Sequence, residues 1–273
     1  MRLIATDLDG TLLGPDGRIG AHNLAALGAA HARGVQVVIA TGRPARWLDC
    51  LQPLAELRPL VLASNGAVEI DLATGGVVRQ HCLSTQQVQA VAADLRAAFP
   101  EISFALEQGF DFGCEPGWLE QTDASMVPEA VSGPALGIPW EDLLAQVRPV
   151  VKLLALSTVR PVEHLAAEAS EIVGERAMVT HSAASASGAL LELSAPGISK
   201  ASALAAICSR IGVDSSEVVA FGDMPNDLAM LTYAGQGFAM ANAHDDLKQR
   251  FPVIGSAADG GVGDTVRRLL AQA

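Results

Sequence analysis

The chain has 273 residues, half of them hydrophobic, and its mean hydropathy is +0.31. This composition is that of a globular protein with one large or two ordinary domains, and it excludes a disordered chain. The net charge of −12, from 18 basic and 30 acidic residues, excludes the basic surface of a nucleic-acid-binding protein. No apolar run approaches the ~18 residues of a membrane-spanning helix, and the apolar N-terminal segment ends at Asp7, too early for a signal-peptide core. We therefore expect a cytoplasmic protein that binds neither nucleic acid nor membrane.

The first third of the chain alternates apolar runs with helical patterns, as expected of a parallel sheet covered on both faces. Strands are predicted at 2–6, 35–40 and 60–64, and helices at 21–33 and around 44–57. The Asn65-Gly66 pair then breaks the pattern. Residues 68–70 and 77–78 are expected to form a hairpin around the Thr74-Gly75-Gly76 turn.

Residues 84–194 have an α+β pattern. Helices are predicted at 85–99 and near 162–173, and strands near 102–106, 110–113, 150–157, 177–181 and 190–193, with a Pro- and Gly-rich stretch at 115–139. From residue 198 the first pattern returns, with helices at 200–211, 226–233 and 262–271 and strands at 218–221 and 237–241. We therefore predict a doubly wound, Rossmann-like α/β core at 1–83 and 195–273, with an α+β domain at 84–194 inserted into it.

Two aspartates one residue apart, Asp7 and Asp9, follow the first predicted strand. Residues i and i+2 of a strand lie on the same face, so both carboxylates are expected beyond the C-terminal edge of the sheet, where open α/β folds place ligands. Two like charges held this close repel, which favours a cation beside them. The alternative is an Asx turn closed by Gly10.

Three further segments place polar residues at strand ends or at a helix start. The Thr-Gly-Arg segment at 41–43 suits an anion cradle, with a helix cap by Thr41 as the alternative. Lys200 lies where the helix dipole disfavours a cation, so it needs a counter-charge unless it is a solvated surface residue. The Gly-Asp-Met-Pro-Asn-Asp segment at 222–227 offers carboxylates and an amide to a hard cation such as Mg²⁺.

Together these groups make a complete set for phosphoryl transfer. Asp7 could attack phosphorus and form an aspartyl-phosphate, while Mg²⁺ and Lys200 offset the repulsion between a carboxylate and a phosphate dianion. Asp9 could protonate the leaving oxygen and then activate water. That role needs a pKa above the ordinary ~3.9, and the charge of neighbouring Asp7 acts in that direction.

The motifs DLDGT (7–11), ATGR (40–43), NG (65–66), SK (199–200) and GDMPND (222–227) resemble, in order and spacing, the haloacid dehalogenase superfamily. The resemblance is to its Cof-like subfamily, with an α/β cap between the second and third motifs, and it spans essentially the whole chain. It implies Mg²⁺-dependent phosphoryl transfer to Asp7, with Asp9 as acid and base and Lys200 as a catalytic cation. It also implies that the cap closes over the site and selects the leaving group.

The resemblance also implies a set of binding residues. The metal would be held by Asp7, the backbone carbonyl of Asp9 and Asp223, with Asp227 supporting this shell. The phosphate-binding residues it implies are Leu8, Thr41, Gly42, Arg43, Asn65 and Asn226. For Arg43 a surface salt bridge is the alternative, and Asn226 could orient either the phosphate or Lys200. Segment 239–243 is given a scaffolding role.

The favoured function is a phosphomonoester hydrolase acting on a small phosphorylated metabolite such as a sugar phosphate. A phosphomutase using the same aspartyl-phosphate chemistry, or a non-catalytic phosphometabolite-binding protein, are the alternatives. In the inserted domain Glu115, Trp118 and Lys152 are the candidates to face the site, but we favour packing for Trp118, a loop-surface charge for Glu115 and a strand-edge charge for Lys152. No nucleotide-binding loop, serine-hydrolase elbow or HExxH motif is present. A monomer is the default expectation.

Overall fold

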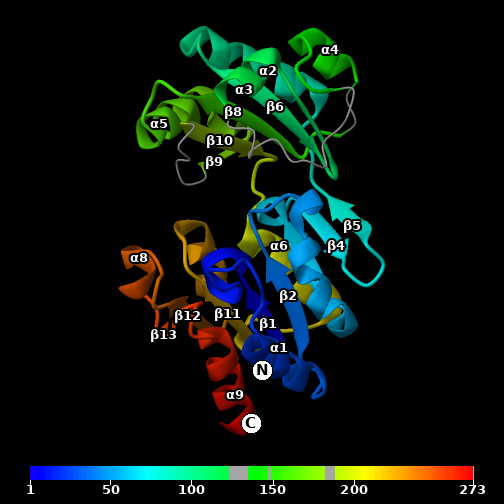
Figure 1. The fold of residues 1–273 in the computed structure, drawn as a ribbon, viewed down its shortest axis with the longest axis vertical. Coiled ribbons are helices and arrows are strands. Elements are labelled where there is room, and N and C mark those ends of the chain that lie inside the picture. Colours follow the sequence, from blue (N-terminus) through cyan, green and yellow to red (C-terminus); the bar gives the residue numbers. More distant parts are fainter. Residues whose placement is uncertain (123–134, 147–148, 182–187, 273) are drawn as a thin grey trace. The chain divides into compact units, whose positions relative to one another are not determined.

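The computed structural model describes residues 1–122, 135–146, 149–181 and 188–272. The chain divides into two compact units (Figure 1). The first unit comprises Met1–Arg79 and Ser199–Ala273, and the second comprises Gln80–Ile198. The functional assignment of these units as a catalytic core and a cap stays a prediction.

A largely parallel sheet forms the centre of the first unit. Among the described residues its strand order is β13-β12-β11-β1-β2-β3-β4-β5. The strands are β1 (Leu3–Thr6), β2 (Gln36–Ala40), β3 (Leu60–Ala63), β4 (Val68–Asp71), β5 (Gly76–Gln80), β11 (Val218–Gly222), β12 (Gln236–Met240) and β13 (Val253–Ile254). The pairs from β13 through β1 to β3 are parallel, and β3 pairs with β4 in the antiparallel sense. The predicted α/β fold is confirmed.

Continuous apolar sequence explains why the central strands are buried on both faces. Every residue of β1 and of β11 is buried, as expected of parallel strands covered by helices. The helices of this unit are α1 (Ala21–His31), α6 (Lys200–Ile211), α7 (Leu228–Tyr233), α8 (Asp245–Lys248) and α9 (Gly261–Gln272). Helix α1 packs against α9, and α6 against α7. Because β1, β2 and β11 run parallel, the polar segments that follow them lie at one edge of the sheet.

The second unit contains a separate antiparallel sheet. Its described strands have the order β7-β6-β8-β10-β9. They are β6 (Ser103–Gln108), β7 (Asp111–Cys114), β8 (Lys152–Ser157), β9 (Met178–His181) and β10 (Ala189–Ser194), with helices α2 (Thr85–Ala98), α3 (Pro116–Gln121), α4 (Trp140–Ala145) and α5 (Val162–Val173). Alternation along β8 turns Leu153 toward a large core that includes residues of α2 and α5, while Leu154 packs with Trp118 of α3 in a smaller cluster.

Several predicted elements differ in the structure. The helix expected around 44–57 is a pair of 3₁₀ segments, Ala45–Trp47 and Asp49–Leu57. In the second segment the ring of Pro53 would clash with the carbonyl four residues earlier in an α-helix, which disfavours that form. The helix expected at 226–233 begins as a 3₁₀ turn, Pro225–Asp227, before α7. Helix α3 lies inside the Pro- and Gly-rich stretch at 115–139, for which no helix was predicted, and residues 123–134 of that stretch lie outside the described residues.

Two expectations for charged residues of the second unit are wrong. Glu115 is not a loop-surface charge: it accepts hydrogen bonds from the Phe104 amide at 2.8 Å and from Arg96 at 2.5 Å. Lys152 is not at a sheet edge, because β8 lies between β6 and β10, and its buried ammonium pairs with Glu192. Trp118 is buried, as expected, with its ring centroid 6.1 Å from that of Phe112.

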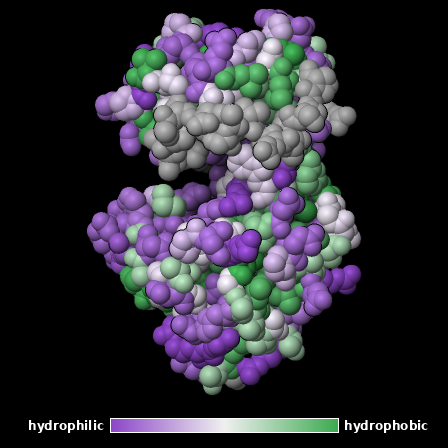
Figure 2. Space-filling model, viewed as in Figure 1, coloured by the Kyte–Doolittle hydropathy of each residue, from purple (hydrophilic) through white to green (hydrophobic). Residues whose placement is uncertain are grey.

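Most large apolar side chains that are exposed among the described residues lie in separate parts of the chain. On the face drawn in Figure 2, hydrophilic and hydrophobic residues are interspersed over the first unit. Trp47 and Val159 are examples, while Val77 and Val78 are neighbours in β5; such scattered exposure is ordinary for a folded protein. Within the described residues, no helix has the length and apolarity that a bilayer crossing requires.

The buried Lys152–Glu192 pair gives a stability prediction. Lys152→Met keeps the length of the side chain but leaves the Glu192 carboxylate, whose side chain is 14% exposed, without this cation. We expect a loss of roughly 3 kcal/mol in the free energy of unfolding, the usual result of removing one partner of a buried pair. The matched control is Lys248→Met, whose exposed pair with Asp245 should contribute nothing measurable. Equal urea midpoints for both variants would contradict the prediction.

Candidate active site

Asp7 lies at the centre of the carboxyl edge of the sheet. It follows β1, and its N–H donates to the Phe221 carbonyl of β11 at 2.9 Å. Strand β1 pairs in parallel with both β2 and β11, so the loops that follow those two strands flank Asp7 on either side. After Asp7 the backbone turns sharply at Gly10, where φ is +75°, and a Cβ at this position would lie 2.2 Å from Oδ2 of Asp223. Glycine is therefore required here.

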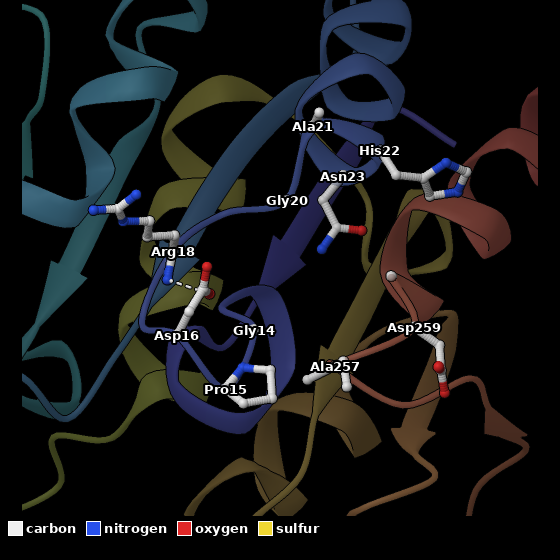
Figure 3. A pocket seen from close by; sticks show the side chains of 12 residues that line it. Gly14, Pro15, Asp16, Arg18, Gly20, Ala21, His22, Asn23, Ala257 and Asp259 are labelled. Carbon is white, nitrogen blue, oxygen red and sulfur yellow. Dashed lines mark hydrogen bonds between the residues drawn. The ribbon is translucent and has the colours of Figure 1, made fainter.

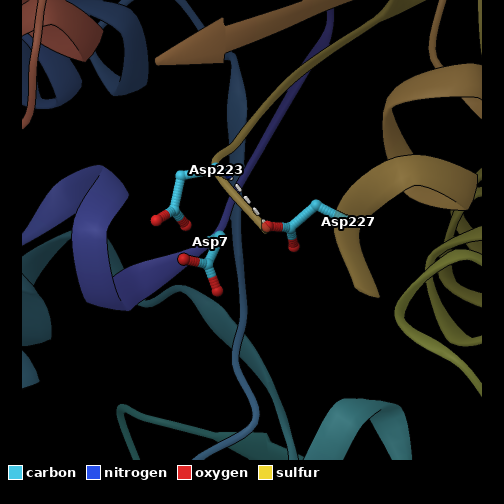
Figure 4. Close-up of side chains that lie close together, drawn as sticks. All are labelled: Asp7, Asp223 and Asp227. Atoms are coloured by element: carbon cyan, nitrogen blue, oxygen red, sulfur yellow. Dashed lines mark hydrogen bonds between the residues drawn. The ribbon is translucent and has the colours of Figure 1, made fainter. Parts of the chain in front are cut away.

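Three carboxylates from two loops gather at this edge. Asp7, Asp223 and Asp227 each offer an oxygen, and these oxygens all lie within 4.8 Å of one another. Figure 4 shows the three side chains close together, with the Asp227 carboxylate hydrogen-bonded to the backbone at Asp223. All three are buried, with Asp227 completely inaccessible. Buried like charges at this spacing require cations to compensate them.

Lys200 supplies one such cation. From the first turn of α6 its Nζ donates to Oδ1 of Asp7 at 2.6 Å and to Oδ1 of Asp227 at 2.7 Å. Burial acts to lower the pKa of Lys200, but the charges of Asp227 and Asp7 outweigh it and hold the pKa above its ordinary value. The lysine is therefore a buried ammonium with two carboxylate partners, and the alternative of a solvated surface residue is excluded.

Asp227 organises this arrangement. While Oδ1 accepts from Lys200, Oδ2 accepts the backbone N–H groups of Asp223 and Met224, each at 3.0 Å. Gly222 makes room for it, because a Cβ there would lie 2.5 Å from the Asp227 Cβ. Both oxygens of Asp227 thus already have donors. This suits the supporting role expected for it better than direct coordination of a metal.

Asp7 and Asp223 are the carboxylates with capacity for a further cation. Burial raises the pKa of Asp7 to about 8, with Lys200 opposing the rise and Asp227 adding to it. Burial and the charge of Asp227 raise the pKa of Asp223 to about 6, although the Thr11 hydroxyl donates to its Oδ1 at 3.2 Å. Three carboxylates face one ammonium, and the donors are all oxygens. This donor set fits a hard divalent cation such as Mg²⁺.

Asp9 lies apart from this cluster of carboxylates. Its side chain is 55% exposed, and both oxygens accept from Arg43, Oδ2 from Nε at 2.7 Å and Oδ1 from Nη2 at 2.6 Å. The hydrogen bond to Asp9 raises the pKa of Arg43 above its ordinary value. The Asp9 carboxylate is therefore paired with the guanidinium of Arg43. Of the two roles considered for Arg43, a phosphate contact and a salt bridge, the structure contains the salt bridge.

The structure brings the other predicted residues to the same edge in different ways. Thr41 is buried, and its Oγ1 accepts the Arg43 N–H at 3.0 Å. Asn226 donates from Nδ2 to Oδ1 of Asn65 at 3.1 Å. The side chain of Leu8 is completely buried, so only its backbone could contact a ligand.

Two polar residues at this edge had been given no site role. Thr11, inside the first motif, holds Asp223 through its hydroxyl. Asn242, assigned to the scaffold, donates from Nδ2 to the Gly10 carbonyl at 2.7 Å and accepts the Ala257 N–H at 3.0 Å. Thr11 could have been identified from its place in the motif. Asn242 could not, because it lies 232 residues from Gly10 along the chain.

A separate concavity of about 420 Å³ lies in the first unit, lined by residues 14–16, 18, 20–23 and 257–260. Figure 3 shows it at close range, with the Arg18 guanidinium pointing away from the other labelled side chains. None of the three clustered carboxylates lines it. We therefore treat this pocket as distinct from the candidate site.

The raised pKa of Asp7 predicts how the stability of the metal-free protein depends on pH. The folded state keeps a proton up to about pH 8 that the unfolded carboxyl, with a pKa of 3.8, releases much earlier. Between these values the folded state binds more protons, so stability falls as pH rises. In EDTA we expect the Tm to decrease from pH 5 to pH 8, and Mg²⁺ to restore it at pH 8. Asp7→Asn should flatten this decrease; a profile identical to wild type would contradict the assignment.

Comparison with known proteins agrees with this geometry. Residues 4–266 match the haloacid dehalogenase-like hydrolase family. The HMP-PP phosphatase of Cronobacter sakazakii is 30% identical over 259 residues, which cover 92% of this chain and 88% of that protein. A haloacid dehalogenase-like hydrolase from Bacteroides thetaiotaomicron has a TM-score of 0.78 at 25% identity, covering 98% of this chain and 99% of that one.

A sugar phosphatase of HAD subclass IIB shares the fold, with a TM-score of 0.78 at 22% identity, and covers 98% of this chain and 99% of its own. The family match spans nearly the whole chain, and the motifs that carry it lie at the carboxyl edge of the sheet. The protein belongs to the haloacid dehalogenase-like hydrolases and is a hydrolase of the HAD phosphatase family.

Proposed function

We propose that the protein is a Mg²⁺-dependent phosphomonoesterase that acts on a small phosphorylated metabolite through an aspartyl-phosphate on Asp7. The observation that carries the proposal is the buried set of Asp7, Asp223, Asp227 and Lys200, in which three carboxylates face a single ammonium. The excess of carboxylates would hold Mg²⁺, and the metal together with Lys200 would offset the charge of an attacking carboxylate and a phosphate. The phosphatase names of the relatives support hydrolysis over transfer to a sugar.

Asp7 is the nucleophile in this proposal. A carboxylate oxygen of Asp7 forms a bond to phosphorus as the bond from phosphorus to the leaving oxygen breaks. Asp7, Asp223 and the backbone carbonyl of Asp9 would hold Mg²⁺, which supplies positive charge that favours the ionised Asp7 and the transferring phosphoryl group. Lys200 contributes its charge directly, because its Nζ already lies 2.6 Å from Oδ1 of Asp7.

Asp9 is the proton donor and acceptor. It gives a proton to the leaving oxygen in the first step, and in the second it takes a proton from the water that attacks the aspartyl-phosphate, which releases inorganic phosphate and restores Asp7. Both oxygens of Asp9 accept hydrogen bonds from Arg43 in the structure. Proton transfer by Asp9 therefore requires this pair to separate. We propose that the phosphate draws Arg43 away from Asp9, which gives the arginine its expected contact with substrate.

The remaining phosphate contacts come from the loops on either side of Asp7. Backbone N–H groups of Leu8 and Gly42 and the Thr41 hydroxyl are the proposed donors, while Asn65 and Asn226, which hydrogen-bond to each other, lie at the same edge. Neutral donors at a sheet edge can bind a phosphate without adding further charge to the site. The substrates to test first are HMP-PP and sugar phosphates, because proteins similar to this chain are named as phosphatases of HMP-PP and of sugars.

Replacement of the nucleophile tests the reaction. We expect Asp7→Asn to lower kcat for phosphate release by at least about 10³-fold, because no covalent intermediate can form. EDTA should abolish the wild-type activity and Mg²⁺ should restore it. Phosphate release is measured over a panel of sugar phosphates, nucleotides and HMP-PP. Full Mg²⁺-dependent activity in Asp7→Asn would exclude this mechanism.

Replacement of Asp9 separates the two steps. With p-nitrophenyl phosphate the leaving oxygen needs little protonation, so Asp9→Asn should release one equivalent of nitrophenol per enzyme in a burst, followed by slow turnover. With an alkyl phosphate the same variant should lose about 10²- to 10⁴-fold in the first step as well. Rapid-quench kinetics on both esters measure the difference, and an equal loss on both without a burst would show that Asp9 does not act on the leaving group.

A further inference from the structure

We propose that Asn65 is a positioning residue of this site, which acts by holding Asn226 and the loop of Asp223 and Asp227 in place. The inference rests on the proposed function for its kinetic consequences. It concerns the short turn Ser64–Gly66, which follows β3. This turn contacts three separate parts of the site through its backbone and through the side chain of Asn65.

The backbone of the turn has an unusual conformation. Ser64, Asn65 and Gly66 have consecutive positive φ values of +51°, +56° and +96°. Residues other than glycine seldom adopt this region, and they do so where the surrounding structure holds them. Two hydrogen bonds do this here: the Ser64 N–H donates to the Arg43 carbonyl at 2.8 Å, and the Asn65 N–H donates to the Thr41 carbonyl at 2.9 Å. The turn is thereby tied to the loop at 41–43.

The side chain of Asn65 contacts the opposite loop. Its Oδ1 accepts a hydrogen bond from Nδ2 of Asn226 at 3.1 Å. Asn226 directly precedes Asp227, which binds Lys200 and two backbone N–H groups of its own loop. Oδ1 of Asn65 also lies close to Gly42, where a Cβ would be 3.4 Å from it. The amide therefore joins the loop after β2 to the loop after β11.

Gly66 brings the same turn against the helix that carries Lys200. A Cβ at Gly66 would lie 2.7 Å from the Ser199 carbonyl and 2.7 Å from the Cβ of Ala203. Only glycine permits this approach, so the turn is packed directly on the first turn of α6. The turn thus contacts the loop at 41–43, Asn226 and the start of α6, and a change in its position would displace groups on both sides of Asp7.

A positioning role and a direct phosphate contact have different kinetic consequences. If Asn65 acts through Asn226, its loss misplaces the reacting groups and lowers kcat while substrate binding changes little. If Asn65 acts by binding phosphate, its loss raises KM and the inhibition constant of inorganic phosphate, whether or not Asn226 is present. Double-mutant cycles distinguish these cases because residues that act through one another are not additive.

The test is a cycle of Asn65→Gly, Asn226→Ala and the double variant. Glycine removes the side chain and suits the positive φ, so backbone strain does not confuse the result. We expect each single variant to lower kcat by about 10- to 100-fold. KM and the inhibition constant of phosphate should stay within about twofold of wild type. The kcat of the double variant should be no lower than that of the more damaged single variant. Arg58→Gly is the control, since Arg58 also has a positive φ of +49° but is exposed outside the site. It should match wild type.

The Kd of Mg²⁺ is measured by calorimetry for the same set of variants, because this measurement does not require turnover. We expect both single variants to weaken Mg²⁺ binding, without a further loss in the double variant. Suppose that the two single variants weaken Mg²⁺ binding without a further loss in the double variant, but that wild type releases no phosphate. This result would contradict the proposed function and support this inference. Independent, multiplicative losses in kcat and in Mg²⁺ affinity, or an effect of Asn65→Gly confined to KM and phosphate inhibition, would overturn it.

Discussion

The site depends on one buried interaction, the ammonium of Lys200 held between Asp7 and Asp227 at 2.6 and 2.7 Å. Desolvating a lysine and two carboxylates is costly, and only close pairing with further hydrogen bonds offsets that cost. The protein meets this requirement by taking Asp7 from β1, Lys200 from the start of α6 and Asp227 from the turn after β11. The lysine balances one of the three carboxylates, which leaves the cluster with an affinity for a second cation.

Loops rather than strands hold this arrangement in register. Asp227 accepts two N–H groups of the loop that presents Asp223, Asn242 holds the Gly10 carbonyl after Asp9, and the Ser64–Gly66 turn contacts the neighbouring loops and α6. Several of these contacts require glycine, because a Cβ at Gly10 or Gly222 would clash with the carboxylate beside it. The glycines of the first and last motifs, Gly10 and Gly222, are thus explained by packing around the acidic side chains, in addition to any approach of the backbone to phosphate.

Sequence periodicity predicted the parallel sheet well, because its central strands are continuous apolar runs bounded by polar loops. The convergence of Asp7 and the 222–227 loop followed from the same rule, since parallel strands end at a common edge. For Lys200, at the start of a helix, the residues themselves predicted only the need for a counter-charge. Side-chain partners in loops could not be predicted. The pairing of Arg43 with Asp9 depends on the turn at Gly10, and the Lys152–Glu192 pair depends on which strands become neighbours in the second sheet. The 3₁₀ form of 49–57 was missed because helical periodicity alone does not register the steric clash that the ring of Pro53 would make in an α-helix.

The central claim, that Asp7 becomes phosphorylated, is tested most directly by chemical trapping. Wild-type protein with Mg²⁺ is quenched during turnover of a phosphate ester and reduced with borohydride, which converts an aspartyl-phosphate to homoserine. Mass spectrometry of the N-terminal peptide then identifies the modified position. The account predicts homoserine at Asp7 in wild type and none in the sample without substrate. Rapid phosphate release with an unmodified Asp7 at every quench time would mean that water attacks the substrate directly.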